Sequence, residues 1–263
     1  MCAVRVMSGG GELRFEGWGI NPERCVGVER LWREAWEGSD RGEFECIVNT
    51  NDFYYEEAGD YCFSNLDEWS GDLVPDFLFS GWGETFLGDY EELIRRLGVY
   101  GESRAETDNV GWVGRCLVDR REELVERFRG SGFSDFRDMS WGSSVDSCVG
   151  YMSMESQVGR WRYMLDIEGH SWSARLKLLF FTNRVVFMVD RPWREYWYRW
   201  LVPWEHYVPV RRDLSDLEEK YNLLMGDLEL ESRILSNARE FAGRYLRRAS
   251  AVGYLRGIIN GIK

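Results

Sequence analysis

The stretch YMLDIEGHSWSARLK, residues 163–177, decides the fold class of this 263-residue chain. Its apolar run Tyr163–Ile167 predicts a short buried strand, and Gly169 predicts the turn that ends this strand. Ser173 is predicted to cap the helix that follows. Free backbone N–H groups at the start of a helix bind anions, so the stretch is a candidate anion site. An ordinary capped helix with a surface arginine is the alternative interpretation.

Strand and helix patterns alternate on both sides of this stretch, which is typical of α/β proteins with parallel sheets. The aperiodic segment 101–109 is interpreted as a linker. We therefore expect an N-terminal domain over 1–104, a C-terminal domain over 105–245 and a final helix over 246–263 that packs back on the first domain. Strands are predicted at 46–48, 61–64, 76–80, 110–115, 163–167, 185–189 and 207–210, and helices at 28–36, 90–97, 119–128, 193–201 and most of 228–259.

The composition indicates a well-packed protein with little affinity for nucleic acid. Apolar residues make up 44% of the chain and aromatic residues 15%, which is enough for a sizeable core. The net charge of −12 argues against general binding of DNA or RNA. The segment 157–212 nevertheless carries ten Lys or Arg residues and five acids. This local positive charge is either a solvated basic face or a phosphate site.

Cysteine and histidine patterns give no sign of a metal site. The six cysteines form no CxxC pair, and the chain has two histidines, so a structural zinc ion is not expected and the thiols are expected to be reduced. The N-terminus lacks the apolar core of a signal peptide, and no apolar run has the length of a membrane span. We therefore expect a cytoplasmic protein without a transmembrane segment.

Several side chains are candidates for chemistry. Asp52 follows the predicted strand 46–48, at the edge where open α/β sheets bind ligands, and is either a general base or a turn residue. Rival acids lie close by in sequence: Glu56, Glu57 and Asp60. His206 is either a ligand contact or a hydrogen-bonded core residue. The tryptophans between 193 and 204 suit a core first, a ligand surface second and a membrane surface third. Neither GxxxxGK[ST] nor GxGxxG is present in 169–177.

Four separated motifs, in this order, resemble those of the CAP10-like and protein O-glucosyltransferase family, glycosyltransferase family 90. They are Asp166-x-Glu168-Gly169-x-x-Trp172-Ser173-x-Arg175-x-Lys177, Trp193-x-Glu195, Pro203-Trp204-x-His206-Tyr207-x-Pro209-Val210 and Asp213-Leu214-Ser215.

The resemblance implies an α/β fold of the GT-B type, with two Rossmann-like domains whose parallel sheets face a central cleft. It implies an inverting transfer of a sugar from a UDP-sugar to a hydroxyl of a glycan or glycoprotein acceptor, without a metal or other cofactor. A cytoplasmic location favours UDP-xylose over UDP-glucose as the donor. The alternatives are a nucleotide-sugar or glycan-binding module without catalysis, and a metal-dependent phosphate enzyme.

The resemblance also implies roles for individual residues. Asp52 matches the catalytic Asp of an Asn-x-Arg-Asp motif, with Asn51 in place of the Arg. Ser173 and Arg175 match a Ser-x-Arg that binds the diphosphate, and Gly169 matches the turn that lets it approach. Where the family often has Trp-Arg-Gly, this chain has Trp112-Val113-Gly114-Arg115, so Arg115 is expected to substitute. Further donor-binding candidates are Lys177, His206, Trp193 and Glu195.

Overall fold

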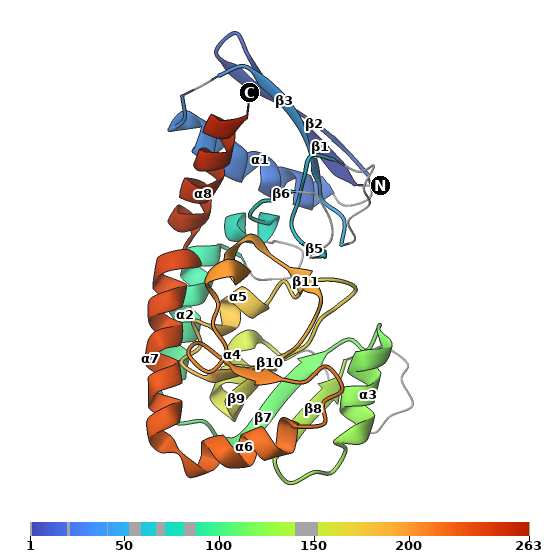
Figure 1. Cartoon of the computed structure of the whole chain (residues 1–263), viewed down its shortest axis with the longest axis vertical. Helices are drawn as coiled ribbons and strands as arrows, with labels where there is room; N and C mark the ends of the chain where they lie inside the picture. The colour runs from blue at the N-terminus through green and yellow to red at the C-terminus, as the bar shows by residue number, and fades with distance from the viewer. Residues whose placement is uncertain are drawn as a thin grey trace. The chain divides into compact units, whose positions relative to one another are not determined.

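The structure is a computed structural model that describes residues 2–19, 22–40, 42–52, 59–66, 72–81, 88–139 and 152–262 (Figure 1). The chain forms two compact units, each made of several segments. Unit 1 comprises Met1–Leu93, Pro192–Trp200 and Gly243–Lys263, and unit 2 comprises Ile94–Arg191 and Leu201–Ala242. The domain boundary expected at 104/105 therefore lies inside unit 2.

Unit 2 contains a five-stranded parallel sheet, which confirms the α/β class. Its strand order is β12 (Val208–Val210), β10 (Val185–Val189), β9 (Trp161–Asp166), β7 (Thr107–Gly114) and β8 (Ser134–Asp138). Every neighbouring pair is parallel. The central strands are apolar and buried because helices and loops cover both faces of a parallel sheet. The sheet places the ends of β7, β9 and β10 at one edge.

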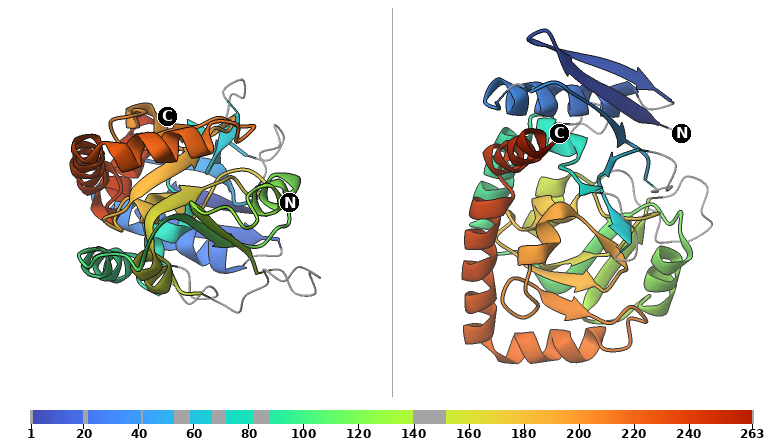
Figure 2. Two further views of the ribbon diagram at one scale, coloured as in Figure 1. Left: turned by 90° about the horizontal axis from the view of Figure 1, so that it is seen from below. Right: turned by 45° about the horizontal axis from the view of Figure 1, so that its top comes forward.

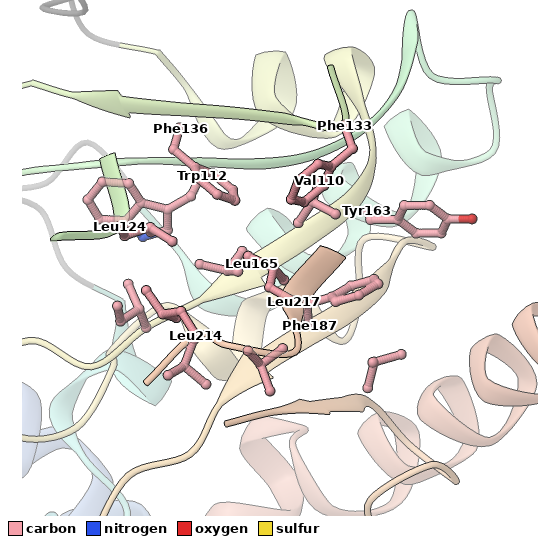
Figure 3. Packing of buried hydrophobic residues seen from close by; sticks show 14 of the residues in the cluster. Val110, Trp112, Leu124, Phe133, Phe136, Tyr163, Leu165, Phe187, Leu214 and Leu217 are labelled. Carbon is pink, nitrogen blue, oxygen red and sulfur yellow. The ribbon is translucent and has the colours of Figure 1, made fainter. Parts of the chain in front are cut away.

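The helices that accompany this sheet vary in length. They are α2 (Tyr90–Gly101), α3 (Asp119–Arg127), α4 (Met154–Arg160), α5 (Leu176–Leu179), α6 (Leu217–Gly226) and α7 (Leu228–Tyr245). Figure 3 shows the core where side chains of the sheet meet those of α3, α6 and the connecting loops. Its large members include Trp112, Phe133, Tyr163 and Phe187. The packing of this core fixes the edge of the sheet where β7, β9 and β10 end, and the candidate site lies at this edge.

Unit 1 has a five-stranded sheet of mixed direction, which differs from the parallel sheet expected there. Its order is β2 (Glu12–Trp18), β1 (Ala3–Gly9), β3 (Phe44–Asn49), β4 (Tyr61–Cys62) and β6 (Asp72–Leu73). Strand β1 is antiparallel to both neighbours, whereas β3, β4 and β6 run parallel. The β1–β2 hairpin turns at Gly10 and Gly11, whose φ angles are 62° and 81°.

Helices pack on this sheet, and a short ladder completes unit 1. Helix α1 (Pro22–Glu37) lies along the β1–β2 hairpin (Figure 2) and also contacts α8 (Arg248–Gly261). Strand β5 (Asn65–Leu66) pairs with β11 (Trp193–Arg194), and η3 (Tyr196–Trp200) follows. Trp197 is fully buried there, as the prediction of a core role requires, whereas Trp193, Trp200 and Trp204 are half-buried. None of the described helices is both long enough and apolar enough to cross a membrane.

Two predicted elements of unit 1 are wrong. Residues 76–80 form the 3₁₀ helix η1 (Phe77–Ser80) and not a strand, because the Asp76 carboxylate accepts a hydrogen bond from the Leu78 N–H at 2.8 Å and caps a helical turn. The predicted helix 193–201 divides into β11 and η3. Five cysteines of the described part are free, and Cys148 lies outside it.

Asp135 fixes the packing of β7, β8 and β9. Its carboxylate accepts hydrogen bonds from Arg137 at 2.6 Å, from Arg160 at 2.9 Å and from the Trp161 indole N–H at 2.9 Å. The Trp161 ring lies against Gly111, where a Cβ atom would come within 1.7 Å of it. Glycine at 111 is therefore required for β9 to approach β7.

The Asp135 contacts predict an acid-sensitive contribution to stability. Burial alone would raise the pKa of Asp135, but the hydrogen bonds from Arg137, Arg160 and Trp161 lower it to about 2. A carboxylate with a lowered pKa in the folded state stabilises the protein above its unfolded pKa and loses that effect as the pH falls. Between pH 5 and 2, wild type should therefore lose about 1 kcal/mol, after allowance for solvent screening, that Asp135→Asn does not lose. Urea unfolding of both proteins across this range measures the difference, and parallel pH curves would contradict it.

Candidate functional site

Asp166 lies at the carboxyl end of β9 and is the centre of a buried polar cluster. Its side chain is 0% exposed, and its Oδ2 atom forms an ion pair with Nη2 of Arg191 at 2.6 Å. Arg191 also donates to the Asp166 carbonyl oxygen at 3.2 Å. The Ser173 hydroxyl donates to Asp166 Oδ1 at 2.6 Å. A buried carboxylate requires such partners, so these contacts fix the segment after the strand.

The helix cap predicted at Ser173 is not formed. Helix α5 begins at Leu176 and has four residues, and its N-cap position is Arg175, which makes no side-chain cap. The Ser173 hydroxyl is instead engaged by Asp166. The anion site predicted at this helix N-terminus therefore lacks the Ser173 cap on which the prediction was based, because Asp166 engages the hydroxyl and the helix is a single turn.

Arg175 brings a second guanidinium to this cluster. Its Nη1 atom donates to the Val113 carbonyl oxygen, at the end of β7, at 2.7 Å. Its Nε atom lies 4.0 Å from Asp166 Oδ1. Burial lowers the pKa of Arg175 to about 10; the Asp166 carboxylate opposes this shift, and the neighbouring Arg121 and Arg191 add to it. Arg175 is thus held beside other positive charges with one carboxylate between them.

Arg121, on α3, supplies a third guanidinium that the sequence motifs do not indicate. Its Nε atom donates to the Glu168 carbonyl oxygen at 2.9 Å, and its Nη1 atom donates to the Arg115 carbonyl oxygen at 3.2 Å. The guanidiniums of Arg121 and Arg175 lie 5.6 and 5.5 Å from the centre of the Trp112 ring. Burial lowers the pKa of Arg121 as well. The π-face of Trp112 near both guanidiniums partly compensates their desolvation.

The cluster carries more positive than negative charge. Three guanidiniums, those of Arg121, Arg175 and Arg191, surround the single carboxylate of Asp166. The nearby Glu168 carboxylate is occupied by Arg212 at 3.0 Å and Arg120 at 3.6 Å. The positive charge lies where β7, β9 and β10 end, which is the edge at which parallel α/β sheets bind ligands. Such an arrangement complements a diphosphate.

Gly169, the predicted close-approach position, lies against this cluster. A Cβ atom there would lie 3.3 Å from Nη2 of Arg121 and 3.5 Å from the Trp172 carbonyl oxygen. The first distance is short for a Cβ atom and would require the guanidinium to move by a few tenths of an ångström, whereas the second is an ordinary van der Waals contact. Glycine at 169 therefore allows the Arg121 guanidinium to lie against the backbone after β9.

The other donor-binding candidates of unit 2 occupy different surroundings. Lys177 is 0% exposed, donates to the Ala174 carbonyl oxygen at 3.1 Å and lies 4.7 Å from the Trp172 ring centre. His206 accepts a hydrogen bond from the Val202 N–H through Nδ1 at 2.9 Å, and burial lowers the pKa of its imidazole. Arg115 is exposed and lends its carbonyl oxygen to Arg121.

Two further candidates, Trp193 and Glu195, belong to unit 1. Trp193 opens β11 and is opposite Leu66 in the short ladder. Glu195 is 3% exposed and accepts a hydrogen bond from the Trp197 indole N–H at 3.2 Å. Both residues therefore lie in the part of unit 1 that surrounds η3.

Asp52 lies in unit 1, just after β3, in a turn that is well defined by hydrogen bonds. The Asn49 side-chain oxygen accepts from the Asn51 N–H at 2.9 Å, and Thr50 N–H donates to the Cys2 carbonyl oxygen at 2.9 Å. The Asp52 carboxylate is 40% exposed and forms an ion pair with Arg24 at 2.8 Å. Among the rival acids, Asp60 accepts from the Ile47 N–H at 2.8 Å, and Glu56 and Glu57 lie outside the described residues.

The sequence assigned no site role to four residues of these two sites, although Trp112 is part of a motif quoted above: Trp112, Arg121, Arg191 and Arg24. A signal exists for Arg191, which follows the apolar strand β10 by two residues, where ligand-binding side chains are common. Arg121 and Arg24 lie on helices and reach the sites only through the fold. Within the described ranges, no group of three or more His, Cys, Asp or Glu side chains could hold a metal ion.

Comparison with known proteins gives a consistent family. The family model "Glycosyl transferase family 90" matches residues 60–261. Protein O-glucosyltransferase 1 of Homo sapiens is 22% identical over 268 residues, which cover 91% of this chain and 66% of the human protein. The Rattus norvegicus protein of the same name is 30% identical over 264 residues, with coverages of 86% and 63%. The chain thus spans slightly less than two thirds of the length of these relatives.

Among solved structures, Anabaena HepE in complex with UDP-glucose is similar over 65% of this chain and 45% of its own, with a TM-score of 0.42 and 10% identity. The family model covers most of the chain, including Asp166, Ser173 and Arg175. The chain therefore belongs to glycosyl transferase family 90.

Proposed function

We propose that the chain is a glycosyltransferase that takes its sugar from a UDP-sugar. The observation that carries the proposal is the guanidinium cluster of Arg121, Arg175 and Arg191 at the carboxyl edge of the unit 2 sheet. A nucleoside diphosphate would bring negative charge to a site where the guanidiniums of Arg121, Arg175 and Arg191 outnumber the buried carboxylates of Asp166 and Glu168. Membership of the family and the Ser173–Arg175 motif support the same assignment.

In the proposed reaction, the acceptor hydroxyl attacks the anomeric carbon in a single displacement with inversion. Asp52 accepts the hydroxyl proton as the new C–O bond forms. The bond between the sugar and the phosphate oxygen breaks, and both of its electrons leave with UDP. Arg175 and Arg121 stabilise the charge that grows on the diphosphate, a task that a metal ion performs in other transferases. We therefore propose that the reaction requires no metal.

For the donor, the names of the relatives support UDP-glucose, because they are protein O-glucosyltransferases. The cytoplasmic location expected from the sequence favours UDP-xylose. We propose UDP-glucose first and UDP-xylose second, with a hydroxyl of a glycoprotein or glycan as the acceptor.

The proposal is tested by incubating the protein with UDP-glucose, UDP-xylose, UDP-galactose and UDP-N-acetylglucosamine, with and without EDTA, and measuring released UDP. Hydrolysis of one donor well above the others, unaffected by EDTA, is the expected result. Binding of UDP without release of UDP from any donor, and without transfer of sugar to added glycoprotein acceptors, would indicate the binding module instead. Release that EDTA abolishes would contradict a metal-free reaction.

Arg175→Ala should weaken UDP binding about 10-fold to 100-fold. A hydrogen bond to a charged group contributes about 1.5–3 kcal/mol, which corresponds to this loss of affinity. Isothermal titration calorimetry with UDP measures it. Arg233→Ala removes the same charge from an exposed position on α7 and should leave the affinity unchanged. Equal affinities of wild type and Arg175→Ala would exclude Arg175 from the diphosphate site.

A further inference from the structure

We propose that Arg24 is a positioning residue that holds the Asp52 carboxylate in place for proton transfer, an inference that rests on the proposed function of Asp52. Arg24 lies in the first turn of α1, and its Nη1 atom is 2.8 Å from Asp52 Oδ1. The same nitrogen donates to the Thr50 carbonyl oxygen at 2.9 Å. One guanidinium nitrogen thus joins the carboxylate to the backbone of its own turn.

The position of Arg24 is itself fixed by packing within unit 1. Its guanidinium lies 5.1 Å from the centre of the Phe77 ring in η1. A Cβ atom at Gly27 would come within 2.6 Å of Phe77, and the Ser80 hydroxyl donates to the Gly27 carbonyl oxygen at 2.9 Å. Helix α1 therefore lies directly on η1, and the Arg24 side chain, 12% exposed, has little freedom.

The Asp52 carboxylate is more exposed to solvent than the Arg24 side chain that binds it. Asp52 is 40% exposed, and its contact with Arg24 is made through Oδ1. An ion pair with an exposed partner contributes little to stability, about 0–1 kcal/mol. In the proposed role, the pair sets the orientation of the carboxylate: Arg24 holds Oδ1, and Oδ2 is left to take the proton of an acceptor hydroxyl. A base that is held in one orientation transfers protons faster than one that rotates.

The residue before Asp52 does not supply a positive charge, because it is Asn51. Its backbone N–H is bound by the Asn49 side chain. The positive charge beside Asp52 comes from Arg24 on α1, which is 28 residues earlier in the chain. Among the described residues, Arg24 is the cation that forms an ion pair with Asp52.

The test measures kcat and KM for UDP release from the best donor, with water as the acceptor. Arg24→Gln should lower kcat about 10-fold to 100-fold, keep KM for the donor within about twofold and leave UDP affinity unchanged, because a positioning residue acts on the chemical step. Arg24→Lys retains one charged donor and should recover part of kcat. Arg33→Gln removes an exposed arginine that pairs with Glu29 on the same helix, and should behave as wild type.

The possible results distinguish the proposed positioning role of Arg24 from the proposed role of Asp52 as the base. If Asp52→Asn is inactive and Arg24→Gln has the kcat of wild type, the inference is wrong and the base is retained. If Asp52→Asn is fully active, Asp52 is not the base and the inference fails with it. A loss in Arg24→Gln that is equal in kcat and UDP affinity, or that a fall in melting temperature accompanies in both Gln and Lys variants, assigns Arg24 a structural role and overturns the proposal.

Discussion

Asp52→Asn should lower the rate of sugar transfer about 1000-fold and leave UDP affinity within about twofold of wild type. General base catalysis contributes about 10²–10⁴-fold to a rate, and an amide cannot accept the acceptor proton. The variant has the same size, and its side-chain oxygen can still accept from Arg24, so the turn after β3 should be retained. UDP release under saturating donor measures the rate, and calorimetry measures the affinity.

Asp60→Asn is the matched control for this experiment. Asp60 is the other described acid of the same region, but its carboxylate accepts from the Ile47 backbone N–H at 2.8 Å and thereby joins the start of β4 to β3. Its replacement should leave kcat unchanged. A large loss in Asp60→Asn with normal activity in Asp52→Asn would move the base from one residue to the other. Normal rates in both would remove this turn from the mechanism.

The part of the fold that the sequence predicted best is the part with the strongest apolar signal. Strand β10 coincides with its predicted range, and β9 differs by one or two residues, because a buried parallel strand is a continuous apolar run. The β1–β2 hairpin was missed because its strands carry charged and glycine residues on their exposed face. The 3₁₀ helix η1 was read as a strand because a side-chain cap by Asp76 has no periodicity to detect.

The sequence predicted where the polar cluster lies better than it predicted how the side chains of the cluster interact. Residues 163–177 do carry the polar cluster, and Arg175 lies within it. The predicted physical cause was different: helix amides capped by Ser173 were expected, and side-chain guanidiniums around Asp166 are found. Arg121 and Arg191 come from separate segments, and only the parallel order β10-β9-β7 brings them together. The formation of such a cluster depends on the order of the strands in the sheet, and the periodicity of apolar residues does not reveal that order.

Asp166→Asn should destabilise the protein by about 3–5 kcal/mol, because removing one partner of a buried ion pair leaves the other charge uncompensated. In this variant the guanidiniums of Arg121, Arg175 and Arg191 lose the negative charge of the Asp166 carboxylate. The asparagine oxygen can still accept from the Ser173 hydroxyl, so the segment after β9 keeps that contact. Urea unfolding of wild type and variant measures the loss, and a change below about 1 kcal/mol would contradict the charge argument.

The same variant should bind UDP more tightly than wild type, by about tenfold, because a diphosphate no longer competes with a carboxylate for the cations; tenfold corresponds to about 1.4 kcal/mol. Saturating UDP should accordingly raise the melting temperature of Asp166→Asn more than that of wild type. Asp135→Asn is the control, since it removes another carboxylate of unit 2 that accepts hydrogen bonds from three side chains, those of Arg137, Arg160 and Trp161. It should lose stability without any change in UDP affinity. Weaker UDP binding by Asp166→Asn would instead show that the carboxylate orients the guanidiniums toward the diphosphate more than it competes with it.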